Sequence, residues 1–109
     1  MEHAYQMAKA NGDLENLHEI APTKVWSYWR LVPNRFPHDK LNRKHLMIVL
    51  NRECDSLWDI TDFELKQLWR TILPYLDDKY DYFKINGKAL RSINNVPHLH
   101  VCVYLDEFK

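Results

Sequence analysis

The sequence has no excess of charge of either sign and very little cysteine. Its 109 residues include 15 Lys and Arg and 15 Asp and Glu, so the formal net charge is zero. A neutral chain creates no overall field that attracts nucleic acid or a membrane surface, and we expect no general affinity for either. The two cysteines, Cys54 and Cys102, are too few for a disulfide scaffold and are typical of reduced thiols in the cytoplasm.

Long apolar runs and a targeting segment are also missing. No apolar stretch approaches the ~18 residues of a membrane helix. Residues 1–5 show neither the basic nor the apolar region of a signal peptide. The hydrophobic content of 46% and the four tryptophans indicate a folded globule. We therefore expect one soluble, cytoplasmic domain without repeats or linkers.

Local patterns predict an α+β protein with an antiparallel sheet. A weak helix is expected over residues 1–20, and a polar loop is expected over residues 34–44. Apolar, aromatic and β-branched runs predict strands over 26–32, 45–50, 82–85 and 97–105. Asn86-Gly87 is a turn signal after the third of these strands. We divide the chain into an N-terminal helical extension, residues 1–25, and a globular unit, residues 26–109.

One long helix is predicted between the second and third strands. Thr61 and Glu64 form a capping box at its start. Apolar residues then follow at helical spacing and predict a core-facing stripe: Leu65, Leu68, Trp69, Ile72, Leu73 and Leu76. Pro74 lies inside this stretch and is expected to kink or end the helix.

The last strand carries the most informative pattern in the chain. Leu99, Val101 and Val103 alternate with His98, His100 and Cys102. Alternation of this kind predicts a half-buried strand whose aliphatic face packs on a core. The two imidazoles and the thiol then share the opposite face, with successive groups ~7 Å apart.

Four segments together give the chain a family resemblance. The segment 96–103 resembles the H-x-H-x-H signature of the histidine triad superfamily. Upstream, Asn34-Arg35-Phe36-Pro37 is similar to that family's Asn-x-aromatic-Pro, and 45–49 is similar to its His-containing strand. Asp59-Ile60-Thr61 is similar to the start of its long helix. The resemblance covers about residues 26–105 and implies a two-layer domain of about five antiparallel strands with a long helix packed on them.

The resemblance also implies chemistry on a nucleotide phosphate. The family's middle histidine, matching His100, attacks the α-phosphate and forms a nucleotidyl-histidine intermediate. The first histidine, matching His98, helps to bind the phosphate and steer the leaving group. His45 matches the histidine that orients the nucleophile. A neutral imidazole is a good nucleophile at pH 7, and two successive displacements lower each barrier. No cofactor is implied.

The chain departs from the family pattern at two places. Cys102 occupies the position of the third histidine, and a neutral thiol is a poor donor there. Cys102 belongs to the predicted catalytic set by its position in the motif. We interpret its thiol as a small, buried packing group rather than a nucleophile. The family's Gly-rich phosphate loop is replaced by residues 91–95. The residues expected near phosphate are Lys88, Arg91, Asn94 and Asn95, with Lys84 just upstream. Asn34 and Asp39 are candidates for the ribose hydroxyls.

We favour a nucleotide phosphate hydrolase or nucleotidyltransferase that acts through His100. One alternative is a catalytically weak or inactive module that binds a nucleotide or phosphate. A second is a zinc site, because His45, His98, His100 and Cys102 are ligand types that zinc prefers. A third is a structural or interaction role. Family members commonly form two-fold dimers, and Trp58, Trp69 and Tyr75 flank the predicted stripe and favour a homodimer.

Overall fold

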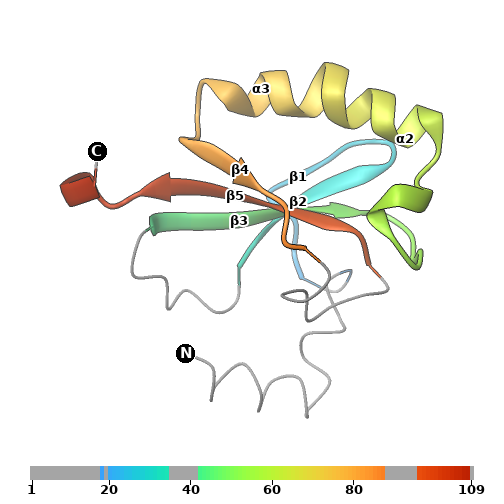
Figure 1. Ribbon diagram of the computed structural model, residues 1–109, viewed down its shortest axis with the longest axis horizontal. Helices are drawn as coiled ribbons and strands as arrows, with labels where there is room; N and C mark the ends of the chain where they lie inside the picture. The colour runs from blue at the N-terminus through green and yellow to red at the C-terminus, as the bar shows by residue number, and fades with distance from the viewer. Residues whose placement is uncertain (1–17, 19, 35–41, 88–95, 109) are drawn as a thin grey trace, which may run out of the picture.

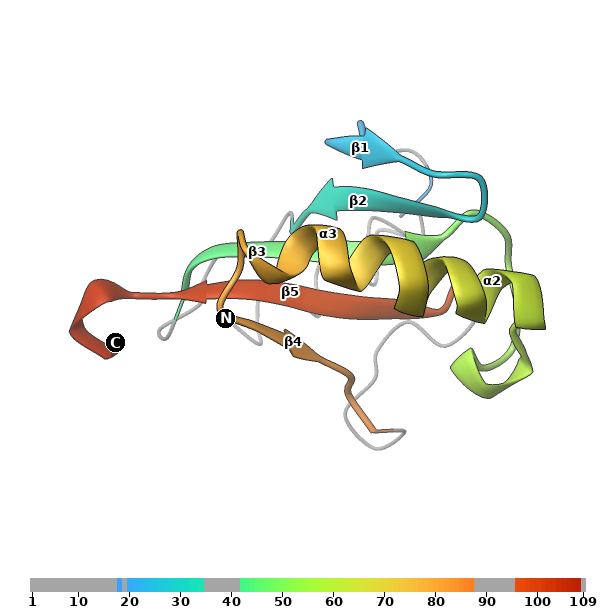
Figure 2. The same ribbon diagram turned by 90° about the horizontal axis from the view of Figure 1, so that it is seen from above.

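Five antiparallel strands form a single sheet, and one helical segment crosses one of its faces (Figure 1). The computed structural model describes residue 18 and residues 20–34, 42–87 and 96–108. The strands are β1 (Lys24–Val25), β2 (Trp29–Pro33), β3 (Asn42–Leu50), β4 (Tyr82–Lys84) and β5 (His98–Tyr104). Their order in the sheet is β1-β2-β3-β5-β4, which Figure 2 displays from the helical side. The predicted fold class and strand number are therefore confirmed.

The largest differences between the observed and the predicted strand boundaries lie in β2 and β3. Residues 26–28 are not part of a strand, because a backbone bond of 2.7 Å from Trp26 N to Trp29 O closes the turn between β1 and β2. The predicted loop over 34–44 was also wrong at its end, since β3 begins at Asn42. The predicted helix over residues 1–20 lies outside the described residues, apart from residues 18 and 20. β1 lies within the predicted extension and pairs with β2.

The core lies between the sheet and the helix. The aliphatic side of β5 faces it as predicted, and Leu99, Val101 and Val103 are buried. Burial of each such side chain contributes ~1.5–3 kcal/mol to folding. The buried cluster comprises Trp29, Leu31, Ile48, Leu50, Leu57, Leu68, Ile72, Leu76, Leu99 and Val101.

The helical segment is wider in its middle than an α-helix. A 3-10 turn (η3, Leu57–Asp59) precedes α2 (Asp62–Gln67), a π-helical segment (η4, Leu68–Ile72) and α3 (Leu73–Asp77). The predicted capping box is confirmed, since Thr61 Oγ1 accepts from Glu64 N at 3.1 Å and Thr61 N donates to Glu64 Oε1 at 2.7 Å. Pro74 has no N–H to donate, and the wide turns immediately precede it.

The prediction of the core-facing stripe of the helix was wrong at two residues, Leu65 and Trp69. The buried side chains of the helix recur at every fourth position: Glu64, Leu68, Ile72 and Leu76. That spacing is longer than the 3.6 residues of an α-helical turn because the π-helical segment widens the period. Leu65 and Trp69 consequently lie outside the core and are 49% and 66% exposed.

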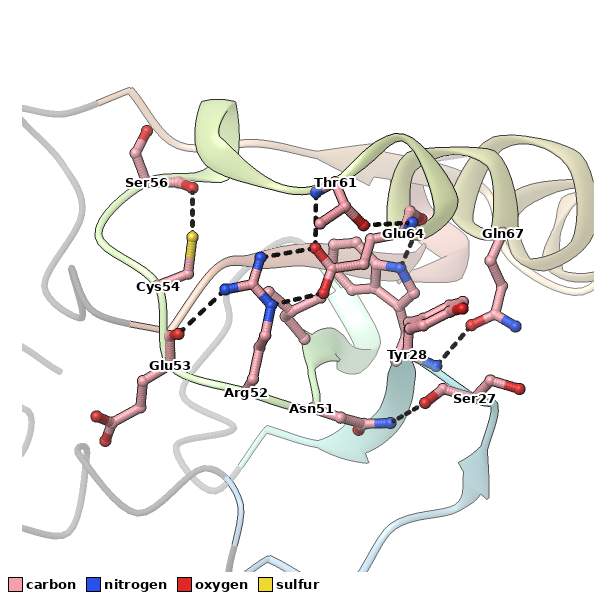
Figure 3. A network of polar contacts seen from close by, with 12 residues as sticks. Ser27, Tyr28, Asn51, Arg52, Glu53, Cys54, Ser56, Thr61, Glu64 and Gln67 are labelled. Carbon is pink, nitrogen blue, oxygen red and sulfur yellow. Dashed lines mark hydrogen bonds and ion pairs between the residues drawn. The ribbon is translucent and has the colours of Figure 1, made fainter.

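Glu64 joins the helix to the end of β3. The Glu64 side chain is only 5% exposed. Its carboxylate accepts hydrogen bonds from Arg52 Nε at 2.7 Å and from Arg52 Nη2 at 2.8 Å (Figure 3). The indole Nε1 of Trp29 donates to the Glu64 carbonyl at 2.9 Å. The hydrogen bonds from Arg52 lower the pKa of Glu64. The helix is thereby fixed to β2 and to the chain that leaves β3.

Candidate functional site

The candidate site lies on the face of the sheet opposite the helix. Two of its histidines, His98 and His100, come from β5, and His45 comes from the neighbouring strand β3. In the antiparallel register His45 pairs with Cys102, which lies two residues after His100 on β5. Because side chains alternate along a strand, these groups share the face opposite Leu99 and Val101. The structure thus brings together four of the predicted site residues, His45, His98, His100 and Cys102.

His45 and His100 are in direct contact. The Nε2 atom of His45 lies 2.7 Å from the Nδ1 atom of His100, and the ring centroids are 4.9 Å apart. Both rings are partly buried. A contact of this length between two ring nitrogens requires one of them to carry the shared proton. The orientation of the His100 ring is therefore fixed by a strand that lies 55 residues earlier in the chain.

Asn86, which follows β4, contacts the other nitrogen of His100. Its amide nitrogen Nδ2 lies 3.3 Å from His100 Nε2. An amide NH₂ can only donate, so Nε2 accepts and carries no proton in the neutral ring. The proton of neutral His100 then resides on Nδ1, from which it is donated to His45 Nε2. This tautomer leaves the lone pair of His100 Nε2 on the side where β4 ends.

His98 is fixed by its own segment. Its Nδ1 lies 2.9 Å from the carbonyl oxygen of Val96, so Nδ1–H donates and Nε2 points elsewhere. Its ring meets that of His100 edge to face, with centroids 5.3 Å apart. The carbonyl of Pro97 accepts from Leu50 N at 3.0 Å, which attaches the start of β5 to the end of β3. His98 and His100 are thus held beside each other by backbone contacts.

Cys102 is fully buried and lies between His45 and Tyr82 in the sheet register. Its burial agrees with our interpretation of this thiol as a packing residue. Cys54 and Cys102 are not joined in a disulfide. The cytoplasmic location inferred from them stays a prediction.

The remaining predicted residues are spread over the chain. Asn34 is half-buried after β2, and its backbone N–H donates to the His45 carbonyl at 3.0 Å. That bond attaches the end of β2 to the strand that carries His45. The other predicted phosphate and ribose residues lie outside the described part of the structure: Asp39, Lys88, Arg91, Asn94 and Asn95.

Sequence reasoning missed Asn86 as a site residue. The Asn-Gly pair was interpreted only as a turn signal after the third strand. No local sequence pattern signals this role, because it depends on the pairing of Lys84, two residues before Asn86, with His100 in the sheet. An amide two residues beyond a strand that pairs with β5 can thus reach the His100 ring.

The described side chains do not support the zinc alternative. Within residues 18, 20–34, 42–87 and 96–108, no group of three His, Cys, Asp or Glu is placed to hold a metal ion. Two nitrogens on one tetrahedral zinc, each ~2.05 Å from the metal, lie ~3.3 Å apart. The contact of 2.7 Å between His45 and His100 is instead the length of a hydrogen bond.

Comparison with known proteins gives one informative likeness. No protein-family model and no curated protein matches the chain. Among solved structures, a histidine triad protein from Clostridium difficile matches with a TM-score of 0.52 over 91% of this chain and 87% of that one. The sequence identity is 22%, so the likeness concerns the fold. The chain has a histidine-triad-like fold, as the sequence predicted.

In the described part of the chain, the helices are too short or too polar to cross a membrane.

Proposed function

We propose that this protein is a nucleotide phosphate hydrolase or nucleotidyltransferase with His100 as its nucleophile. The observation that carries the proposal is the bond of 2.7 Å between His45 Nε2 and His100 Nδ1. Together with the amide NH₂ of Asn86 beside Nε2, it holds the proton of His100 on Nδ1 and directs the Nε2 lone pair toward the substrate. An oriented, neutral imidazole is the group that nucleophilic catalysis on phosphorus requires at neutral pH.

The reaction proceeds through two displacements at one phosphorus atom. In the first, His100 Nε2 forms a bond to the α-phosphorus of a nucleotide ester, anhydride or phosphoramidate. The bond from phosphorus to the leaving group breaks, and the leaving group takes the electron pair and a proton from solvent. In the second, water or another acceptor forms a bond to the same phosphorus and loses a proton to solvent, while the bond from phosphorus to His100 Nε2 breaks and returns its electron pair to the ring. His45 accepts the hydrogen bond from Nδ1–H and stabilises the positive charge that develops on the ring.

Other side chains are proposed to hold the substrate. The amide of Asn86 lies beside Nε2, and its NH₂ can donate to a phosphate oxygen once phosphorus occupies that position. His98 lies next to His100 and is proposed to steer the leaving group. Lys88, Arg91, Asn94 and Asn95 remain proposed phosphate contacts, and Asn34 and Asp39 remain proposed ribose contacts.

A binding module with weak turnover is the alternative that one observation favours. Cys102 is fully buried, so its thiol does not present a donor to a ligand. An enzyme of this type that lacks its third imidazole has one fewer group to stabilise charge on the phosphate. This alternative predicts binding of AMP without formation of an adenylyl-protein.

His100→Ala separates these two functions. We expect the unmodified protein to release AMP from adenosine 5′-phosphoramidate and to show a bound adenylyl group by mass spectrometry after acid quenching. The variant is expected to lose the adduct and at least ~10³-fold in kcat/KM, because the nucleophile is removed. Far-UV circular dichroism checks that the variant is folded. Unchanged turnover in His100→Ala refutes the assignment, whereas AMP binding without turnover in the unmodified protein supports the module.

A two-fold homodimer is proposed for the helical side of the molecule. Several large apolar side chains are exposed on and just before the helix, among them Trp58 at 78% and Phe63 at 72%. Aromatic side chains of this kind are enriched at the centres of protein interfaces. An isologous contact would cover the same residues on both copies.

A further inference from the structure

Lys84 lies directly opposite the proposed nucleophile. It is the last residue of β4 and pairs with His100 in the antiparallel register of β4 and β5. Residues that oppose each other in this way place their side chains on the same face, with Cβ atoms ~5 Å apart. Lys84 is exposed and forms no ion pair with another described residue. Its ammonium group is therefore available to a ligand at His100.

The two ring nitrogens of His100 face different strands. Nδ1 contacts His45 on β3, and Nε2 contacts Asn86, two residues beyond Lys84. A phosphorus atom bonded to Nε2 consequently lies on the β4 side of the ring. The flexible four-carbon stem of Lys84 reaches across the ~5 Å between opposed Cβ atoms to that side.

A cation in this position would offset the negative charge of the proposed substrate. The proposed substrate carries at least one negative charge on its α-phosphate, and phosphoryl transfer is accelerated mainly by groups that stabilise this charge. His100 is proposed as a neutral nucleophile, Asn86 is neutral, and the buried Cys102 replaces an imidazole. Lys84 is the described cation whose register places it beside His100.

We propose that Lys84 binds a non-bridging oxygen of the α-phosphate at His100 Nε2 and supplies the positive charge that the histidine cluster lacks. This inference rests on the proposed function, because it names the cation of the same site. It makes β4 a third strand that contributes to substrate binding, beside β3 and β5.

The test compares Lys84→Met and Lys84→Arg with a matched control, Lys44→Met. Lys44 is also an exposed strand lysine, but it pairs with Val103 and so lies on the opposite face of the sheet. Binding of AMP and of adenosine is measured by titration calorimetry, and turnover is measured with adenosine 5′-phosphoramidate. Adenosine lacks the phosphate and reports whether the nucleoside still binds.

Loss of the ammonium should weaken AMP binding about tenfold, since a charge-assisted hydrogen bond to phosphate is removed. The affinity for adenosine should not change. AMP binding by Lys84→Met should also depend less steeply on salt concentration. Lys84→Arg should keep most of the AMP affinity because the charge remains, and Lys44→Met should behave like the unmodified protein.

The outcomes distinguish this inference from the proposed function. If the unmodified protein binds and turns over its substrates while Lys84→Met matches it in both, the role of Lys84 is refuted and the proposed function stands. If the unmodified protein binds AMP without turnover, the enzyme proposal fails, and the affinity of Lys84→Met still decides the role of Lys84. Absence of AMP binding in the unmodified protein refutes both.

Discussion

Removal of the Glu64 carboxylate should destabilise the fold more than any exposed substitution on the helix. This carboxylate binds Arg52 through both of its oxygens and accepts from Thr61 N, while its side chain is 5% exposed (Figure 3). Glu64→Ala leaves the Thr61 N–H and the Arg52 guanidinium without these partners. It also removes one half of the capping box at the start of α2.

The expected loss is ~3 kcal/mol in the free energy of unfolding. Removal of a hydrogen-bonded charged partner costs about 1.5–3 kcal/mol, and loss of the helix cap adds about 1 kcal/mol. The lower part of the summed range applies here because the Arg52 side chain is 45% exposed and water replaces part of its lost interaction. For a domain of this size, ~3 kcal/mol corresponds to a decrease in Tm of ~12 °C.

The contribution of Glu64 to the free energy of unfolding should decrease as the pH falls. The pKa of Glu64 is lowered in the folded protein, first by the hydrogen bonds from Arg52. The unfolded chain therefore binds this proton more readily than the folded protein does. The stabilisation is complete above the unfolded pKa of ~4.3 and is lost as the pH falls through the lower folded value. The stability difference between the unmodified protein and Glu64→Gln should shrink in that acidic range.

Urea denaturation at pH 7 and across the acidic range measures both effects. Glu53→Gln is the matched control, because Glu53 is exposed and its side chain forms no ion pair with the described residues. Arg52→Met combined with Glu64→Ala gives the coupling between the two side chains. A loss below ~1 kcal/mol in Glu64→Ala would place this network among ordinary surface ion pairs and refute the reasoning.

Two further predictions concern activity and assembly. Cys102→His should raise turnover of adenosine 5′-phosphoramidate if the third imidazole is the missing group. The larger ring replaces a fully buried thiol, so a cost of ~1–3 kcal/mol in stability is expected beside it. Unchanged turnover, with AMP still bound by a folded variant, would contradict this account. If the homodimer forms, light scattering at micromolar concentration should give twice the chain mass of 13.2 kDa, and Trp69→Glu should return it to the monomer. A mass of one chain for the unmodified protein contradicts the homodimer.

Short-range sequence patterns predicted much of the fold. The alternation of Leu99 and Val101 with the histidines determined which face of β5 packs on the core, because a strand has a period of two residues. The Thr61–Glu64 spacing located the start of the helix, since that spacing is required by a local hydrogen-bond pair. Both features depend on neighbours in the sequence, and the structure confirms both.

Features that depend on tertiary contacts or unusual backbone could not be predicted in this way. Leu65 and Trp69 fit an α-helical stripe, but the π-helical segment changed the period and left both outside the core. The partner of the His100 Nε2 atom was equally inaccessible. Asn86 reaches it only because β4 pairs with β5, and no local pattern encodes that pairing.

The contact between His45 and His100 has a consequence for the order of folding. The two residues lie 55 positions apart, on the two strands with the most extensive pairing in the sheet. Closing a loop of that length is entropically unfavourable until the β3–β5 ladder forms and compensates for it. A locally folded fragment, such as the β1–β2 hairpin or the isolated helix, contains neither His45 nor His100. The imidazole proton shared by these residues should therefore appear in NMR spectra only when the central ladder is complete, and it can serve as a probe of global folding.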